Sequence, residues 1–174
     1  YTSLFRSVVL VCLLYFLYKL LIPKSFRCMT VVKKYLSFRE LKDRINNESF
    51  SKVVIDEKKS GKIEIYYSSK WIYADEVYIP RKLVLDLIAE RKSLYSSFEK
   101  LSIATKNGEN IVFAIIDIEE AEKIIKSLQG IFEEFTLDFN NMRKIQNRIL
   151  RKEIKQEFYK RVINKEDFLK ESGL

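Results

Sequence analysis

The stretch Leu4–Ile22 most limits what this chain can fold into, because it is long, apolar and bracketed by charge. Residues 7–18 contain no charged side chain, and Arg6 and Lys19 lie near the two ends. Its 19 residues would span about 28 Å as an α-helix, which is close to the roughly 30 Å of a bilayer core. We therefore predict a transmembrane anchor within residues 1–23.

A cleaved signal peptide and a buried core helix are the two alternatives for this stretch. Signal cleavage requires small residues after the apolar run, but the run is followed by Lys-Leu-Leu-Ile-Pro-Lys at residues 19–24. A core helix normally carries a polar face, and residues 7–18 have none. Both alternatives fit the residues less well than insertion into a membrane.

The charge next to the apolar stretch predicts its orientation. Residues 24–52 contain eight Lys or Arg against three Asp or Glu. Lys and Arg close to a span are retained on the cytoplasmic side of the membrane. The predicted localisation is therefore the membrane, with a single visible span and a cytoplasmic domain after it.

The charge of the remaining chain divides it into segments. Residues 24–52 and 138–170 each carry a net charge of +5, whereas residues 53–137 carry −3. The middle segment is long enough to form a domain with its own core. The predicted organisation is a transmembrane anchor (1–23), a basic juxtamembrane helix (24–50), an α+β domain (51–136) and a C-terminal basic amphipathic helical segment (137–174).

Periodicity predicts the elements of these segments. Apolar residues at three-to-four spacing predict one helix over residues 25–48. Alternating residues predict short strands, at residues 52–55, 62–67, 70–73 and 77–79. We expect an α+β fold with a mostly antiparallel sheet of about five or six strands, packed by helices near residues 81–92 and 118–135.

The first of these packing helices is expected after the fourth strand. Pro80 suits the first turn of a helix, where its missing N–H costs nothing. Leu83, Leu87 and Ile88 would then lie on one face. The sequence therefore predicts a helix from Pro80 to Lys92.

A hairpin and a second helix are expected next. Asn107-Gly108 lies between two alternating runs, residues 99–105 and 109–115, and both residues tolerate positive φ. This pair predicts a β-hairpin. Asp117 is expected to cap the helix that follows, with acidic residues in its first turn.

The segment 138–170 shows two apolar stripes at helical spacing. One stripe comprises Phe139, Met142, Ile145 and Ile149, and the other comprises Leu150, Ile154, Phe158 and Val162. One interpretation is a core stripe with a basic face in solvent. The other is an amphipathic helix that binds a membrane surface or a partner.

Signatures of catalysis are missing from the sequence. The chain contains no histidine, which removes the commonest general base and many metal sites. Asp56-Glu57 beside Lys58, Lys59 and Lys62 could in principle bind Mg²⁺, and the acidic cluster at residues 117–120 could bind Ca²⁺. A charged strand end and a helix start explain both clusters without a metal, so we predict no cofactor and no metal site.

Three features occur in a fixed order in the middle of the chain. They are Lys70-Trp71-Ile72-Tyr73, then Tyr78-Ile79-Pro80-Arg81-Lys82, then the Asn107-Gly108 hairpin with a closing helix. Over residues 52–130 this order resembles the compact PH-like domains of small membrane-anchored bacterial proteins. The resemblance implies a cytoplasmic β-rich domain behind one or two membrane helices, with no assigned activity.

The chain departs from that family in two respects. A typical PH domain has seven strands and no helix where Pro80–Lys92 is expected. No basic phosphoinositide motif matches position by position, so the resemblance identifies no lipid-binding residues.

The function predicted from these features is a non-enzymatic, membrane-anchored binding or assembly module, an accessory subunit of a membrane complex. The alternatives are an immunity protein against a membrane-active toxin and a metal-dependent enzyme that uses carboxylates. The expected partners are membrane lipids, which contact the anchor and the basic flanks, and a protein partner or a second copy of the chain. The aromatic and glycine signatures of RNA-binding modules are missing, so no nucleic acid is expected.

The candidate contact residues are basic or aromatic. Trp71 and Tyr73 lie in an aromatic patch that either forms part of the sheet core or, if exposed, contacts a partner. The basic candidates flank the folded middle of the chain. They are Lys24, Arg27, Lys33, Lys34, Arg148, Arg151, Lys152 and Lys155.

Overall fold

The computed structural model describes residues 27–59, 61–91, 95, 97–132 and 148–174. The predicted anchor, residues 1–23, lies outside these ranges. Within them the fold is α+β, as predicted, and none of the helices is both long and apolar enough to cross a bilayer.

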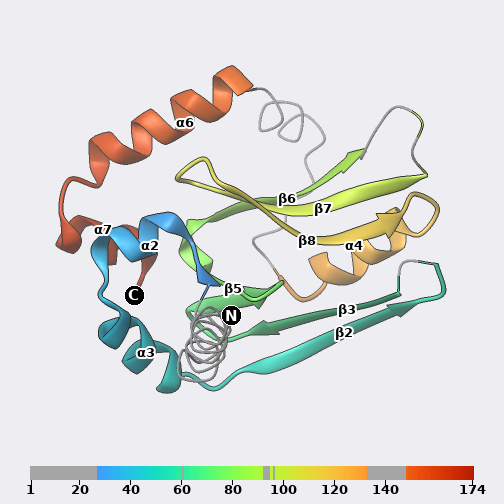
Figure 1. The fold of residues 1–174 in the computed structure, drawn as a ribbon, viewed down its shortest axis with the longest axis horizontal. Coiled ribbons are helices and arrows are strands. Elements are labelled where there is room, and N and C mark those ends of the chain that lie inside the picture. The colour runs from blue at the N-terminus through green and yellow to red at the C-terminus, as the bar shows by residue number, and fades with distance from the viewer. Residues whose placement is uncertain (1–26, 60, 92–94, 96, 133–147) are drawn as a thin grey trace, which may run out of the picture.

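Most of the described strands follow one another along the chain (Figure 1). The strands are β1 (Arg27–Cys28), β2 (Ser51–Glu57), β3 (Gly61–Tyr67), β4 (Trp71–Ala74), β5 (Val77–Pro80), β6 (Val84–Arg91), β7 (Phe98–Thr105) and β8 (Asn110–Asp117). The helices are α2 (Thr30–Tyr35), α3 (Phe38–Asn46), the 3₁₀ turn η1 (Arg81–Leu83), α4 (Ala121–Gln129), α6 (Arg148–Arg161) and α7 (Lys165–Ser172). Helices α2 and α3 precede β2, and α4, α6 and α7 follow the last strand.

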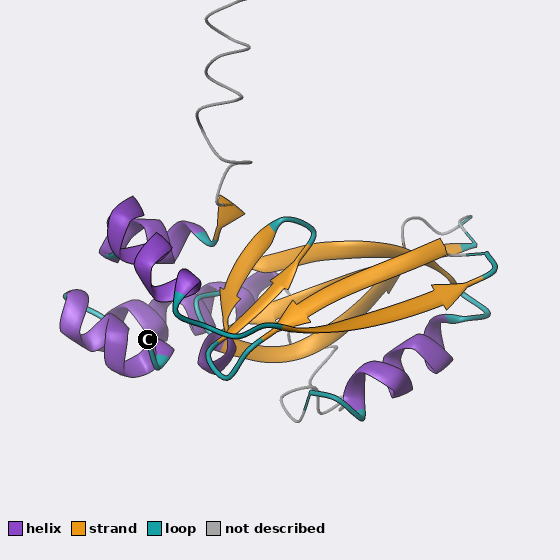
Figure 2. Ribbon diagram, turned by 90° about the horizontal axis from the view of Figure 1, so that it is seen from below, coloured by secondary structure: helices purple, strands orange, loops and turns teal. Residues whose placement is uncertain are grey.

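The described strands form two sheets, not the single sheet that was predicted. A five-stranded sheet has the order β1-β5-β4-β3-β2, and a three-stranded sheet has the order β6-β7-β8. All neighbours are antiparallel except β1 and β5. Figures 1 and 2 show α4 beside one end of the strands and α2, α3 and α7 at the other.

The predicted helix Pro80–Lys92 is wrong. After η1 the chain forms β6, which pairs with β7 from Val84 to Arg91. Leu87 and Ile88, adjacent residues that point to opposite faces of a strand, are both fully buried. A strand buried on both faces reads as a continuous apolar run, which periodicity cannot distinguish from a buried helix.

The single helix predicted for residues 25–48 is also wrong, because it is broken into β1, α2 and α3. Leu36 is extended (φ −117°, ψ 133°) and ends α2. Ser37 then starts α3 with a capping box: the Ser37 side chain accepts from the Glu40 N–H, and the Glu40 carboxylate accepts from the Ser37 N–H at 2.9 Å. This Ser-x-x-Glu signature fixes a new helix start.

The predicted hairpin is confirmed, although its turn differs from the expected one. Gly108 has φ +77°, and its N–H donates to the Thr105 carbonyl at 2.9 Å. Asn107 is not among the described residues with positive φ, so the loop is a type I turn with a glycine bulge. Asp75 and Glu76, between β4 and β5, are the adjacent pair with positive φ (47° and 64°), as a type I′ turn requires.

Helix α4 confirms the second packing helix, with a different cap. Ala121, Ile124, Ile125 and Leu128 are buried. The N-cap is Glu120, whereas the Asp117 carboxylate accepts from the Glu119 N–H at 2.9 Å in the preceding turn.

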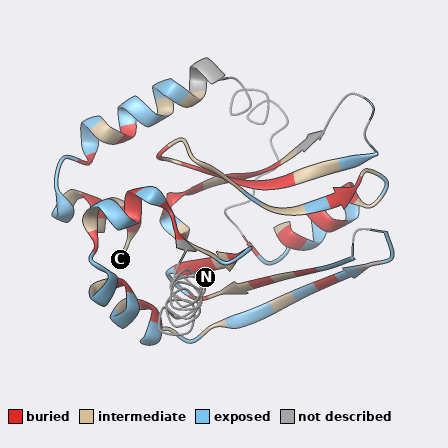
Figure 3. Cartoon of the chain, in the orientation of Figure 1, coloured by how far each residue is buried: buried red, intermediate tan, exposed pale blue. Residues whose placement is uncertain are grey.

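The C-terminal helices belong to the same hydrophobic core as the sheets. Phe158 and Val162 of the second predicted stripe are buried, as is Phe168, and all three join the cluster that contains Trp71 and Leu101. Figure 3 shows this burial along the strands and on α6 and α7. For these residues the core-stripe interpretation is confirmed; Phe139, Met142 and Ile145 lie outside the described residues.

Candidate functional site

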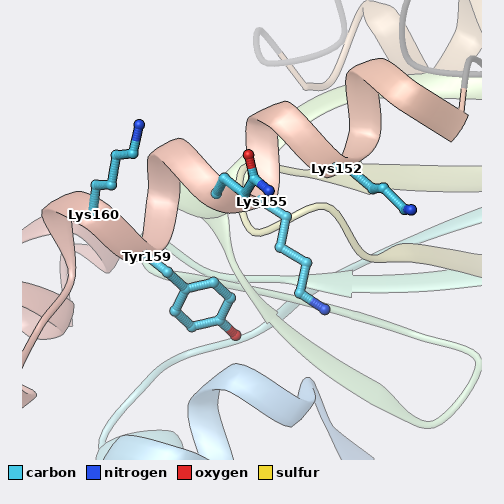
Figure 4. Close-up of a pocket in the computed structure, with 5 residues that line it drawn as sticks. Lys152, Lys155, Tyr159 and Lys160 are labelled. Atoms are coloured by element: carbon cyan, nitrogen blue, oxygen red, sulfur yellow. The ribbon is translucent and has the colours of Figure 1, made fainter.

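Side chains along α6 line a hollow that is rich in lysine (Figure 4). Its volume is about 480 Å³. A second hollow of about 280 Å³ shares Lys152 and Lys155 with it and extends to the turn between β7 and β8. We call the two together the basic groove. It is lined by Gly108, Arg151, Lys152, Lys155, Gln156, Tyr159 and Lys160.

The glycine of the β7–β8 turn allows α6 to lie against that turn. A Cβ atom on Gly108 would lie 3.0 Å from the Arg151 carbonyl oxygen and 3.0 Å from the Lys155 Cβ. The positive φ of Gly108 would strain any other residue as well. Beside it, the Asn110 amide oxygen accepts from Arg151 Nη1 at 3.2 Å when the amide is oriented toward that donor.

Two aromatic contacts bring the N-terminal basic helix α2 to the groove. The Tyr35 hydroxyl donates to the Val162 carbonyl at 3.1 Å, and its ring stacks on Phe168 with centroids 5.0 Å apart. Lys34 Nζ then lies 5.0 Å from the ring centroids of both Tyr35 and Tyr159. Basic segments that are more than a hundred residues apart in the sequence therefore meet at Tyr159.

Tyr159 is the half-buried aromatic residue of the groove. Burial raises the pKa of its hydroxyl, and the charge of Glu109 and the neighbouring Tyr35 add to the increase, while Lys34 opposes it. The phenol is therefore neutral at physiological pH. It offers an apolar ring and one hydroxyl to a ligand.

The cations of the groove make few ion pairs within the described part of the chain. Among the described residues, no ion pair joins Lys34, Lys152, Lys155 or Lys160 to a carboxylate. Glu109 is the carboxylate whose charge raises the pKa of Tyr159. The groove therefore combines an excess of positive charge with an aromatic ring and aliphatic lysine stems, an arrangement that fits an anionic group attached to apolar carbon.

The structure brings together four of the basic residues predicted from the sequence. Arg151, Lys152 and Lys155 line the groove, and Lys34 reaches its aromatic ring. Lys33 is exposed on α2 and is not among the lining residues. Lys24 lies outside the described residues, and the side chains of Arg27 and Arg148 are likewise not described.

The two aromatic candidates lie elsewhere. Trp71 is fully buried, which confirms the core alternative and leaves its side chain no contact with a partner at the surface. Tyr73 is half-buried in an aromatic row, with ring centroids 5.9 Å from Tyr66 and 4.4 Å from Tyr78.

Sequence reasoning missed Gln156, Tyr159 and Lys160. A signal for them was present, because residues 152, 155, 156, 159 and 160 recur at helical spacing. Gly108 was recognised as a turn residue, but its contact with α6 is a tertiary feature with no local signal.

The acidic cluster after β8 is engaged by a lysine from the β2–β3 turn. Lys59 forms an ion pair with Glu119, and its backbone N–H donates to Glu120 at 3.2 Å. The described residues hold no group of three or more side chains that could bind a metal ion.

Comparisons with known proteins found no matching family model, no matching curated sequence and no matching solved structure.

Proposed function

We propose that this chain is a non-enzymatic, membrane-anchored binding module, an accessory subunit of a membrane complex, whose basic groove contacts anionic lipid headgroups. The observation that carries the proposal is that Lys152, Lys155 and Lys160 line one hollow with Tyr159, whose ring Lys34 Nζ also approaches, without paired carboxylates among the described residues. The groove offers charge, an aromatic ring and aliphatic stems, and no pair of side chains suited to general acid–base chemistry.

Charge and chemistry both favour a lipid surface. A Lys or Arg close to an anionic membrane contributes about 1 kcal/mol to binding. Long lysine stems and a tyrosine ring suit the boundary between headgroups and acyl chains. The attraction acts within a Debye length of roughly 8 Å at physiological salt, so the groove must lie close to the bilayer.

The position of the groove in the chain suits an anchored domain. The described chain begins with β1 at Arg27, four residues after the end of the proposed anchor. Helix α2, which supplies Lys34, follows at once and is docked on the α6–α7 junction through Tyr35. A domain tethered at this end keeps its basic groove within reach of the same membrane.

The arrangement of the sheets supports a PH-like domain as part of the proposal. β2–β5 and β6–β8 are seven antiparallel strands followed by α4, and the short β1 adds a parallel eighth strand at the edge of the first sheet. Without β1, the strand number and the closing helix are those that the resemblance implies. The helix expected at Pro80–Lys92, which departed from the family, is a strand instead.

Alkaline extraction of membranes tests the anchor. We expect the full-length chain to stay with the membrane pellet at high pH and to enter solution only with detergent. In the variant Leu13→Arg with Leu17→Arg, each arginine costs about 2.5–3.5 kcal/mol at the centre of a span, and the protein should move to the supernatant. A wild-type chain that is released without detergent would contradict the proposal.

Crosslinking after detergent extraction tests the role as a subunit. We expect one protein to co-purify with the chain in a fixed ratio. In membranes that have not been treated with detergent, protease added to the cytoplasmic side should digest the domain. A monodisperse, isolated monomer would contradict this part of the proposal. The anchor and the groove are tested by separate experiments.

A further inference from the structure

Three tyrosines form a row across the outer face of the five-stranded sheet. Tyr66 pairs with Tyr73, and Tyr73 pairs with Tyr78, in the register of β3, β4 and β5. Directly opposite residues of neighbouring strands share one face of a sheet, and the ring centroids lie 5.9 Å and 4.4 Å apart along the row. The residues that alternate with them are buried in the core; these are Ile65, Ile72 and Ile79. The tyrosine row therefore faces away from the core.

The rings of the tyrosine row are half-buried, so part of each ring is accessible. Burial raises the pKa of Tyr73 and of Tyr78 above the ordinary value. Both phenols are therefore neutral at physiological pH. A neutral tyrosine combines an apolar ring with a polar hydroxyl, as do the aromatic residues found at the boundary between lipid headgroups and acyl chains.

The charges around the tyrosine row give it no excess of positive charge. Glu64 accepts a hydrogen bond from the Tyr66 hydroxyl at 3.2 Å and forms ion pairs with Lys52 and Lys62. In the turn between β4 and β5, the charges of Glu76 and Asp75 add to the rise in the pKa of Tyr73 that burial causes. The charged groups that act on the row, directly or through Glu64, are Lys52, Lys62, Glu64, Asp75 and Glu76. The row therefore suits an apolar interfacial contact and does not by itself attract an anion.

Strand β1 lies between the tyrosine row and the basic groove. Cys28 pairs with Tyr78 in the parallel register of β1 and β5, and its Sγ donates to the Tyr78 carbonyl at 3.2 Å. Burial raises the pKa of the Cys28 thiol to about 12, and the charges of Lys33 on α2 and of Glu109 in the β7–β8 turn also act on it. Glu109 acts on Tyr159 of the groove as well. Figure 1 shows α2 and α6 on one side of β1, and β5, β3 and β2 on the other.

The length of the tether limits how far the tyrosine row can lie from the membrane. The proposed anchor ends at residue 23, and Arg27 begins β1. The four Cα–Cα steps between them reach about 14 Å at most. Tyr78 lies one strand beyond β1, which is about 5 Å away. A membrane that meets the chain at this point can contact the groove on one side of β1 and the row on the other.

We propose that the tyrosine row is a second membrane contact, in which the rings of Tyr66, Tyr73 and Tyr78 lie in the interfacial layer of the bilayer. The inference rests on the proposed anchor and groove, and it adds an apolar contact to the electrostatic one. The row has no excess of positive charge of its own. On an anionic bilayer the groove therefore supplies the attraction, and the rings enter the interface once the groove has docked.

Photocrosslinking from the tyrosine row tests this contact. Tyr73→p-benzoylphenylalanine is made in the full-length chain, which is placed in nanodiscs that contain phosphatidylglycerol, and mass spectrometry identifies what the photoprobe captures. We expect lipid adducts at this position. Tyr95 is the matched control, because it lies between β6 and β7, outside the row, and is 99% exposed. The same replacement at Tyr95 should give several-fold fewer lipid adducts.

Removal of the rings gives a second reading without a photoprobe. Tyr66→Ser with Tyr73→Ser removes two rings of the row, whereas Tyr95→Ser removes a ring outside it. Energy transfer from Trp71 to a dansyl-labelled lipid in the same nanodiscs should fall several-fold in the double variant and stay at the wild-type value in the control. Urea unfolding, followed by the fluorescence of Trp71, establishes that each variant is folded.

The outcomes separate the tyrosine row from the basic groove. If Lys155 is shielded from acylation in these nanodiscs but Tyr73 captures no lipid, the row is not a membrane contact and the docking of the groove stands. Capture of a second copy of the chain in place of lipid would overturn the proposal by assigning the row to a protein interface. Lipid adducts at Tyr73 with an unshielded Lys155 would support the row and refute the docking of the groove.

Discussion

Phe158→Ala is expected to destabilise the folded domain by about 3–5 kcal/mol, the usual cost of removing a buried phenylalanine. The Phe158 side chain is fully buried and belongs to the same core cluster as Trp71 and the sheet residues. A typical domain is stable by only about 5–15 kcal/mol. The substitution should therefore remove a large share of the free energy of unfolding. It should also loosen the packing of α6, which carries the basic groove.

Urea unfolding of the full-length protein in neutral micelles measures this effect, with the fluorescence of the single, buried tryptophan as the probe. Ile163→Ala is the matched control, because Ile163 follows α6 but is 78% exposed. Exposed substitutions usually change stability by less than about 0.5 kcal/mol. If Phe158→Ala unfolded at the same urea concentration as the control, α6 would not be part of the core.

Replacing Lys152, Lys155 and Lys160 together by glutamine is expected to release the domain from an anionic bilayer. Three lysines at about 1 kcal/mol each amount to roughly a hundredfold change in the equilibrium between docked and undocked domains. Energy transfer from Trp71 to a dansyl-labelled lipid, with the chain in nanodiscs that contain phosphatidylglycerol, measures how close the domain lies to the membrane. The transfer should fall in the variant and, for the wild type, with added salt.

Lys42→Gln, Lys58→Gln and Lys170→Gln together form the control for that variant. They remove the same charge from exposed positions outside the groove. Their energy transfer should stay near the wild-type value. Equal losses in the two triple variants would show that net charge alone holds the domain at the membrane, and the groove would have no special part.

The elements that could be predicted from the sequence are those marked by a local pattern of apolar and turn residues. Strands β2 to β5 follow from alternation, and the β7–β8 hairpin follows from Asn107-Gly108 between two such runs. The prediction failed at β6, where Leu87 and Ile88 are both buried and the periodicity of a half-buried strand is lost. It also failed at Ser37, although the capping box with Glu40 was visible in the sequence.

The site could be predicted only as a set of basic residues. Charge and spacing identified Lys34, Arg151, Lys152 and Lys155 as candidates. They did not predict that these residues lie close together in the fold. It depends on the stacking of Tyr35 on Phe168 and on its hydrogen bond to Val162. Contacts between residues so far apart in sequence depend on how the helices pack in three dimensions, and no local pattern encodes them.

Acylation of lysines in nanodiscs tests the central claim most directly, because mass spectrometry reads each lysine separately. The account predicts that Lys152, Lys155 and Lys160 of the wild-type chain react several-fold more slowly in anionic than in zwitterionic nanodiscs, whereas Lys42 reacts at the same rate in both. Equal rates at Lys155 in the two kinds of nanodisc would contradict the docking of the basic groove on anionic lipid.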